Sequence, residues 1–286
     1  MDQAILQALE GIRNQFLDIL FAAWTMLGEE TFITAIIAIV FLCIHKDLGE
    51  KMLLTILSAS ALCTGLKSAV QRTRPYGAEV VSKVEIDTPI VSTNDLELNM
   101  SFPSGHSCAS ASFFGNIALT FRRPLVIILC IIAVSGVMFS RLYLGVHYPT
   151  DVITGFAIGA LFALLWQLVY DKFYQKRLWI FLAIGILTLP FLFIPRTMTD
   201  SMFKISAITL AAAIALLLED RFFCFADATR WWKRILRLVI AAAAAAIPFL
   251  LLNLLPEHNW VTFAQYFTAI FAALTVAPLC IVKWKL

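Results

Sequence analysis

A succession of long apolar runs constrains the fold of this chain more than any other feature. A helix that crosses a bilayer needs about 20 mostly apolar residues, whereas a soluble domain carries about 25% charged residues. This sequence has 286 residues, of which 60% are hydrophobic and 14% are charged. We therefore predict an all-α fold, a polytopic membrane helix bundle. Its expected spans lie at about 30–45, 52–70, 104–121, 124–141, 149–170, 178–194, 203–218, 235–255 and 262–283.

The segment before these spans, residues 4–27, is amphipathic. It contains Glu10, Arg13 and Asp18 among apolar residues. A first span, a re-entrant segment and an interfacial helix are all compatible with this pattern, and the sequence leaves the three alternatives open.

Loops on alternate sides of the predicted bundle differ in their basic residues. The richer set includes Lys46, Arg122, Lys172, Arg221 and Lys283. By the positive-inside rule this set faces the cytoplasm. The opposite side, where the residues that look catalytic lie, then faces the exterior or a lumen. We expect a multi-pass protein of a bacterial cell membrane with an outward-facing site, or of the endoplasmic reticulum with a luminal site if the source is eukaryotic.

The longest polar connection, about 75–102, lies on that exterior side. It is rich in acidic residues, and Lys83 is its single basic residue. Long loops of this kind are often either functional or merely mobile. A flap beside an active site and a solvated loop are therefore both left open.

Three short stretches place charged residues at the ends of spans on the exterior side. They are Lys67–Pro75, Pro103–His106 and Ser140–Asp151. Ionisable groups at membrane depth are costly, and they indicate a functional site by default. We expect the three stretches to lie close together.

The cations of these stretches predict a phosphate pocket. Lys67, Arg74 and Arg141 have no obvious acidic partner at the same depth. Converging cations suit a doubly charged tetrahedral oxyanion, and the arginine fork matches phosphate geometry. Ser104 and Gly105 begin a helix, whose N-terminus favours an anion, and a glycine lets the backbone approach the ligand closely.

The histidines supply the reactivity. His147 and Asp151 are four residues apart, and Pro149 between them is well placed to begin a helix. Residues at this spacing share one helix face, so the carboxylate can fix the imidazole tautomer and leave the other nitrogen as a nucleophile. His106, on another helix, can protonate the departing oxygen.

Each residue also has a simpler interpretation. The three cations could be side chains that snorkel at helix ends. Ser104 and Asp151 could cap helices, and His106 could be an ordinary residue of a first helical turn. The joint occurrence of all these residues at these spacings on one predicted face favours a site.

Taken together, the motifs resemble those of the PAP2 (type 2 phosphatidic acid phosphatase) family of integral membrane phosphatases. The family patterns K-x6-R-P, P-S-G-H and S-R-x5-H-x3-D match Lys67–Pro75, Pro103–His106 and Ser140–Asp151 in the family order. The resemblance implies a six-helix core with its site at the outer face. It also implies His147 as the nucleophile with Asp151 as its orienting partner, His106 as the general acid, no metal and no cofactor. The implied phosphate-binding residues are Lys67, Arg74, Ser104, Gly105 and Arg141.

We divide the chain at residue 175. Residues 1–175 form the predicted PAP2-like catalytic membrane core. Residues 176–286 form a C-terminal extension of about four transmembrane helices with no ionisable cluster of its own. Packing support is the favoured role of this extension, and a dimer surface and part of a lipid route are left open.

The leading functional hypothesis is a metal-independent lipid phosphate phosphatase that works through a phosphohistidine. Candidate substrates are an isoprenyl diphosphate, phosphatidate, phosphatidylglycerol phosphate or a sphingoid phosphate, with a soluble sugar phosphate as a lesser option. The alternatives are a phosphotransferase with an acceptor other than water, and a non-enzymatic lipid or anion transporter. The expected partners are the bilayer and a membrane lipid phosphate, without nucleic acid, and a homodimer is left open.

Overall fold

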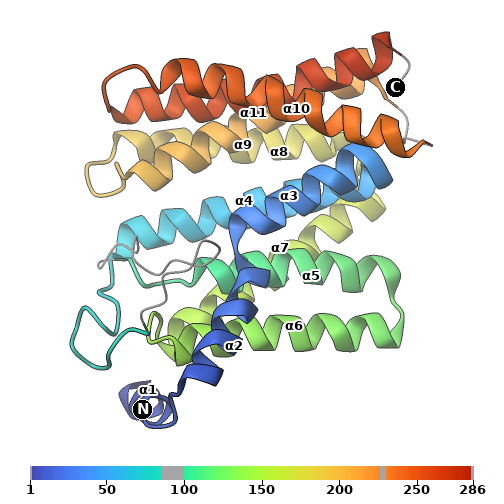
Figure 1. Cartoon of the computed structure of the whole chain (residues 1–286). Coiled ribbons are helices and arrows are strands. Elements are labelled where there is room, and N and C mark those ends of the chain that lie inside the picture. The colour runs from blue at the N-terminus through green and yellow to red at the C-terminus, as the bar shows by residue number, and fades with distance from the viewer. Residues whose placement is uncertain (1, 85–99, 226–229, 285–286) are drawn as a thin grey trace. The chain divides into compact units, whose positions relative to one another are not determined.

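Helices make up all the regular structure of the residues that the computed structural model describes, namely 2–84, 100–225 and 230–284 (Figure 1). The all-α prediction is confirmed. Residues 85–99, the greater part of the predicted flap or solvated loop, lie outside the described ranges. The elements are α1 (Asp2–Glu10), α2 (Gln15–Thr25), η1 (Met26–Gly28), α3 (Glu30–Ile39), η2 (Val40–Ile44), α4 (Lys46–Val70), α5 (Gly105–Phe121), α6 (Pro124–Tyr143), α7 (Pro149–Lys172), η3 (Tyr174–Lys176), α8 (Arg177–Thr188), η4 (Leu189–Phe193), α9 (Asp200–Leu218), η5 (Glu219–Phe223), α10 (Trp231–Leu252) and α11 (Asn259–Lys283).

Tertiary contacts group the chain into two compact units, and each is described by itself. Unit 1 consists of Met1–Thr34 and Leu62–Gln167, and unit 2 consists of Ala35–Ala61 and Leu168–Leu286. Helices α4 and α7 contribute residues to both units. The functional division at residue 175 stays a prediction.

Seven helical segments of the described residues are long and apolar enough to cross a membrane, or eight if one bent pair is a single span. Four of the seven belong to the C-terminal part, as predicted: Tyr174–Phe193, Asp200–Phe223, Trp231–Leu252 and Asn259–Lys283. The others are α4, α6 and α7. The chain is therefore a multi-pass membrane protein.

The predicted span 30–45 needs correction. Helix α3 and the π-helical segment η2 together cover only about 22 Å, less than the roughly 30 Å of a hydrocarbon core. Residues Glu30–Ile44 and the preceding segment Gln15–Gly28 together form a bent helix pair, and the bend between the two halves is 48°. The 17 residues of α5 are at the lower limit for a span. These two regions account for the difference from the nine spans that we expected.

Residues 4–27 do not form one helix. Helix α1 ends at Glu10, and α2 begins after Asn14, whose side chain accepts a hydrogen bond from Leu17 N. Arg13, between the two helices, donates to the carbonyl oxygens of Tyr143 (3.0 Å) and Ser82 (2.8 Å). With nine and eleven residues, neither helix can span a bilayer alone.

Close backbone packing in unit 1 holds the start of α5 against the second and third turns of α7. A Cβ at Gly155 would lie 2.3 Å from Ser104 O, and a Cβ at Gly159 would lie 2.3 Å from Cys108 O. Only glycine allows this approach. Helix α6 packs along the other side of α5 (Figure 1).

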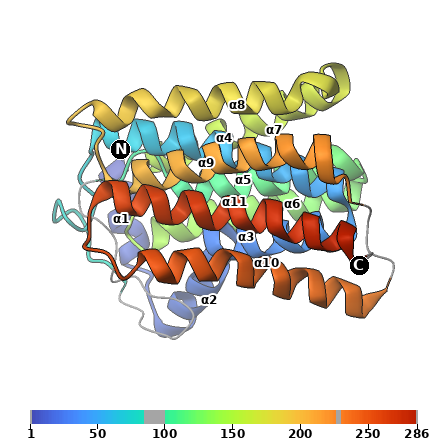
Figure 2. The ribbon, with the colours of Figure 1, turned by 90° about the horizontal axis from the view of Figure 1, so that it is seen from above.

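In unit 2, α9 packs against α8 and α11, and α10 packs against α11 (Figure 2). This unit contains a buried ionic cluster, which corrects the expectation that the C-terminal part has none. Arg177 Nη2 lies 3.2 Å from Glu50 Oε2 and 2.8 Å from Asp220 Oδ1. Lys46 Nζ lies 2.6 Å from Glu219 Oε1. The cluster could not be predicted from the sequence because Lys46 and Glu50 belong to α4, which is distant in the chain from Arg177 and Asp220.

Candidate active site

Contacts join the three predicted motifs at one end of unit 1. Ser104 N donates to Asp151 O at 3.0 Å, and Arg74 Nη1 lies 3.4 Å from His147 Nε2. Lys67 Nζ lies 3.8 Å from the position that a Cβ on Gly105 would occupy. The predicted residues sit at helix ends or in links: Lys67 in the last turn of α4, Arg74 after it, Ser104, Gly105 and His106 at the start of α5, Arg141 in the last turn of α6, His147 in the following link, and Asp151 in the first turn of α7.

The buried pair His147 and Asp151 forms the centre of this site. Their side chains are 2% and 0% exposed, and Nδ1 lies 3.5 Å from Oδ2. This separation is longer than a normal hydrogen bond, as is common for catalytic pairs without substrate. The other ring nitrogen, Nε2, faces the guanidinium of Arg74. The two nitrogens of His147 thus face groups of opposite charge.

Asp151 is held from several sides. Its Oδ2 accepts hydrogen bonds from the Ser101 hydroxyl and from Tyr148 N (2.9 Å). Its Oδ1 accepts from Arg72 Nη1 at 2.9 Å. The Arg72 guanidinium also donates to Thr150 Oγ1 (2.7 Å) and stacks 3.9 Å above the Tyr148 ring centroid. The carboxylate therefore has little freedom to rotate.

Arg72 is a site residue that the sequence analysis missed. It precedes Arg74 by two residues, in an extended segment. Arg74 is directed to His147, whereas Arg72 is directed to Asp151. Alternation along an extended segment could have suggested that the two arginines serve different neighbours.

The two arginines of the predicted phosphate pocket are buried in unit 1, and Lys67 is half-buried. Arg74 and Arg141 are each 4% exposed. Arg74 Nη1 donates to Val146 O at 3.1 Å, and Arg141 Nη1 donates to Thr25 Oγ1 at 2.8 Å. The Nε atom of Arg141 is buried without a hydrogen-bond partner. A buried guanidinium with spare donor capacity can bind an oxyanion.

The first turn of α5 combines a cap with two site residues. Ser104 accepts from Ser107 N at 3.4 Å and from the Ser107 hydroxyl at 3.0 Å, so that it caps the helix. A Cβ on Gly105 would lie 3.8 Å from both Lys67 Nζ and Glu30 Oε1. The site therefore includes the electropositive N-terminus of a helix.

Two carboxylates that the sequence analysis missed also lie at this site. Glu29, at the bend between η1 and α3, places Oε2 3.1 Å from His106 Nε2. Glu30 Oε1 lies 3.8 Å from a Cβ position on Gly105. The expectation that the cations lack acidic partners at the same depth is therefore wrong. The bend of the helix pair turns these two residues toward the first turn of α5, although they precede Lys67 by a long stretch of sequence.

Burial and charge keep His147 neutral. Burial of the imidazole, followed by the charges of Arg74, Arg141, Lys67 and His106, holds the pKa of His147 well below its ordinary value of 6.5. The ring therefore carries one proton at pH 7. With Nδ1–H directed to Asp151, the lone pair is on Nε2, which a nucleophile requires.

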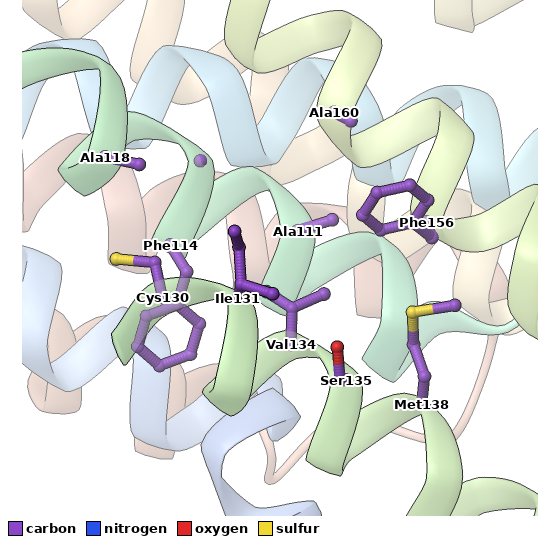
Figure 3. Close-up of a pocket in the computed structure, with 11 residues that line it drawn as sticks. Ala111, Phe114, Ala118, Cys130, Ile131, Val134, Ser135, Met138, Phe156 and Ala160 are labelled. Atoms are coloured by element: carbon purple, nitrogen blue, oxygen red, sulfur yellow. The ribbon is translucent and has the colours of Figure 1, made fainter. Parts of the chain in front are cut away.

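An apolar cavity of about 370 Å³ lies between α5, α6 and α7 (Figure 3). Ala111 follows His106 by just over one helical turn, and Phe156 stands in the same relation to Asp151. The cavity therefore begins within about 8 Å of these catalytic candidates along the helix axes. Its lining residues are Ala111, Phe114, Gly115, Ala118, Cys130, Ile131, Val134, Ser135, Met138, Phe156 and Ala160.

Comparisons with known proteins agree with the motifs. Residues 50–175 match the family model described as PAP2 superfamily, and residues 203–286 match the model described as PAP2 superfamily phosphatase, transmembrane extension. A solved Bacillus subtilis structure, a transmembrane PAP2 type phosphatidylglycerolphosphate phosphatase, is 30% identical with a TM-score of 0.49, covering 60% of this chain and 85% of that one.

Curated relatives point the same way. Phosphatidylglycerophosphatase B of Bacillus subtilis is 32% identical over 56% of this chain and 78% of the relative. Lipid A 1-phosphatase of Rhizobium etli is 35% identical over 44% of this chain, and the match spans only 51% of that relative. Decaprenylphosphoryl-5-phosphoribose phosphatase of Mycobacterium tuberculosis is 34% identical over 36% of this chain and 50% of the relative. On the two family models, the match to phosphatidylglycerophosphatase B and its three motifs, the chain belongs to the PAP2 superfamily.

Proposed function

We propose that this chain is a metal-independent lipid phosphate phosphatase that works through a phosphohistidine on His147. The observation that carries the proposal is the position of the buried His147 imidazole, which has Asp151 at Nδ1 and Arg74 at Nε2. A carboxylate that orients an imidazole prepares a nucleophile, and a cation beside the attacking nitrogen attracts a phosphoryl group to it.

In the first step, His147 Nε2 attacks the phosphorus of the substrate. The N–P bond forms while the bond between phosphorus and the leaving oxygen breaks, and His106 donates its proton to that oxygen. The positive charge that develops on the His147 ring is stabilised by Asp151. The dephosphorylated product then leaves with the proton from His106.

In the second step, water attacks the phosphorus of phospho-His147. His106, now neutral, accepts a proton from this water, the N–P bond breaks, and the electron pair returns to Nε2. Inorganic phosphate is released, and both histidines regain their initial protonation states. The net reaction consumes one water and forms one phosphate.

The phosphoryl oxygens are held by cations and by a helix N-terminus. Arg74 lies beside Nε2 of His147, and the charges of Arg141 and Lys67 also act on this ring. Ser104 and Gly105 contribute the cap and the first residue of α5. These charges stabilise the equatorial oxygens in the transition state. Because this stabilisation is assigned to side chains, EDTA should leave the rate unchanged.

The proposed substrate is a lipid. The chain is a multi-pass membrane protein, and the apolar cavity beside the catalytic residues can accept hydrocarbon. Relatives carry names that refer to lipid A, phosphatidylglycerophosphate and decaprenylphosphoryl-5-phosphoribose. For this chain, the substrates to test are isoprenyl diphosphates, phosphatidate, phosphatidylglycerol phosphate and sphingoid phosphates. The distribution of basic residues supports an exterior or luminal site.

The test is phosphate release by purified protein in detergent with EDTA, over those lipids and glucose 6-phosphate. We expect one lipid class to be preferred, His147→Ala to lose all release, and vanadate to inhibit as a mimic of the trigonal-bipyramidal phosphoryl group. Full activity of His147→Ala would refute the phosphohistidine. Strong inhibition by EDTA would show that a metal takes part.

A further inference from the structure

The contact between Glu29 and His106 has no counterpart in the three motifs. Glu29 Oε2 lies 3.1 Å from His106 Nε2, and the two side chains are 46% and 21% exposed. This distance is within the range of a charge-assisted hydrogen bond. This contact occupies one ring nitrogen of His106, so the proton for a leaving group would come from the other nitrogen, Nδ1.

The carboxylate of Glu29 opposes the effect of the cations that surround His106. Cations disfavour a protonated imidazole, and a carboxylate in contact favours it. Burial of the ring, followed by the charge of Arg141, lowers the pKa of His106 to about 4 although Glu29 opposes the shift. A general acid must be protonated when it acts, so His106 needs both this carboxylate and the negative charge of a bound phosphate to hold its proton. The charged and titratable groups that act on His106 from the neighbouring segments are Lys67, Arg141, His147 and Glu29.

Close packing fixes the position of Glu29. A Cβ on the preceding residue, Gly28, would lie 2.9 Å from His106 O and 2.7 Å from Val137 Cγ1. Thr25, one turn earlier, accepts a hydrogen bond from Arg141. The segment from Thr25 to Glu29 is thus held against both α5 and α6, and the bend that follows directs Glu29 to His106.

We propose that Glu29 is a positioning residue for the general acid His106. It accepts a hydrogen bond from Nε2–H, aims Nδ1–H at the leaving oxygen and stabilises the imidazolium before the transfer. During cleavage the Nδ1 proton passes to the leaving oxygen as the P–O bond breaks, and Glu29 keeps its hydrogen bond without taking a proton. This inference rests on the proposed function, in which His106 is the acid.

The test uses the dependence of the rate on the leaving group. A lipid monophosphate releases an alkoxide and needs the acid, whereas 4-nitrophenyl phosphate releases a stable phenolate and needs it little. For Glu29→Gln we expect kcat/KM to fall about 10- to 100-fold on the lipid, by analogy with the hydrogen-bonded partners that orient metal-ligating side chains. The aryl ester should be affected much less, and the alkaline limb of the pH profile on the lipid should move to lower pH.

Two variants act as controls. Glu30→Gln removes the neighbouring carboxylate, which lies beside Lys67 and Gly105 rather than on the ring nitrogen, and should leave the ratio of lipid to aryl rates unchanged. Glu29→Asp keeps the charge and should recover part of the lipid rate. Melting temperatures in detergent check that each variant is folded.

The outcomes separate this inference from the proposed function. Equal losses on both esters with an unmoved alkaline limb would overturn the role of Glu29. A change of the ratio in Glu30→Gln as large as that in Glu29→Gln would overturn it as well. A wild-type protein that releases no phosphate, or a His147→Ala variant that remains active, would overturn the proposed function itself.

Discussion

Arg177 in unit 2 and Arg141 in unit 1 are both buried, but their charges are partnered differently. In unit 2, Arg177 contacts the carboxylates of Glu50 and Asp220, and Lys46 contacts Glu219. In unit 1, Arg141 donates to the neutral hydroxyl of Thr25 and keeps a buried Nε without a hydrogen-bond partner. Cations neutralised by carboxylates hold helices together, whereas a cation with spare donors is available to an anionic ligand. Composition alone does not distinguish these two arrangements.

The largest expected effect is that of His147→Ala. Removal of a nucleophile lowers kcat on the order of 10⁴-fold or more, because water cannot replace the oriented imidazole. Phosphate release from the preferred lipid measures this loss. The melting temperature should stay close to that of the wild type. A large fall in the melting temperature would instead show that His147 is needed for the stability of the fold.

Arg177→Met should act on stability and not on turnover. Glu50 would remain buried without its partner, which costs about 3–5 kcal/mol. The apparent melting temperature in detergent should fall, while phosphate release per folded molecule should not change. Arg141→Met is the matched variant in unit 1, and for it we expect the opposite result. Similar effects of both substitutions on turnover would break the comparison between the units.

Arg72→Met tests whether a cation paired with a carboxylate can also serve the site. Loss of the contact with Oδ1 should let Asp151 rotate away from His147, and small misplacements of catalytic groups cost about 10²-fold in rate. Arg72→Lys should recover part of kcat, since it restores the charge without the planar fork. An unchanged kcat in Arg72→Met would show that Ser101 and Tyr148 N hold the carboxylate without help.

The smallest expected effect is the contribution of His147 to the pH dependence of folding stability. The pKa of His147 is well below 6.5 in the folded protein, so below pH 6.5 the unfolded chain binds a proton that the folded protein does not. Stability should therefore decrease as the pH falls from about 6.5, by up to about 1.4 kcal/mol per pH unit. His147→Ala should lack this contribution. Melting temperatures of both proteins between pH 7.5 and 5.5 measure the difference, and parallel curves would contradict it.

Local sequence patterns were sufficient to predict the positions of most helices and to identify the residues of the three motifs. Apolar runs predicted the positions of α4 to α11, and the motifs predicted which end of the helices carries the site. The roles of His147, His106 and Asp151 remain proposals. The spans before α4 were harder to predict because residues 31–44 carry no charged side chain. This stretch therefore resembles a complete span, although it is one half of a bent helix pair.

The sequence by itself determined that this is a multi-pass helical protein of the PAP2 superfamily, because hydropathy and motif spacing are properties of short stretches of chain. Only the tertiary structure decided which charges meet. Glu29 reaches His106, Arg72 reaches Asp151 and Glu50 reaches Arg177 because helices that are distant in the chain pack side by side. The energy of a buried charge depends on these neighbours, and neighbours across helices are not encoded in any local pattern.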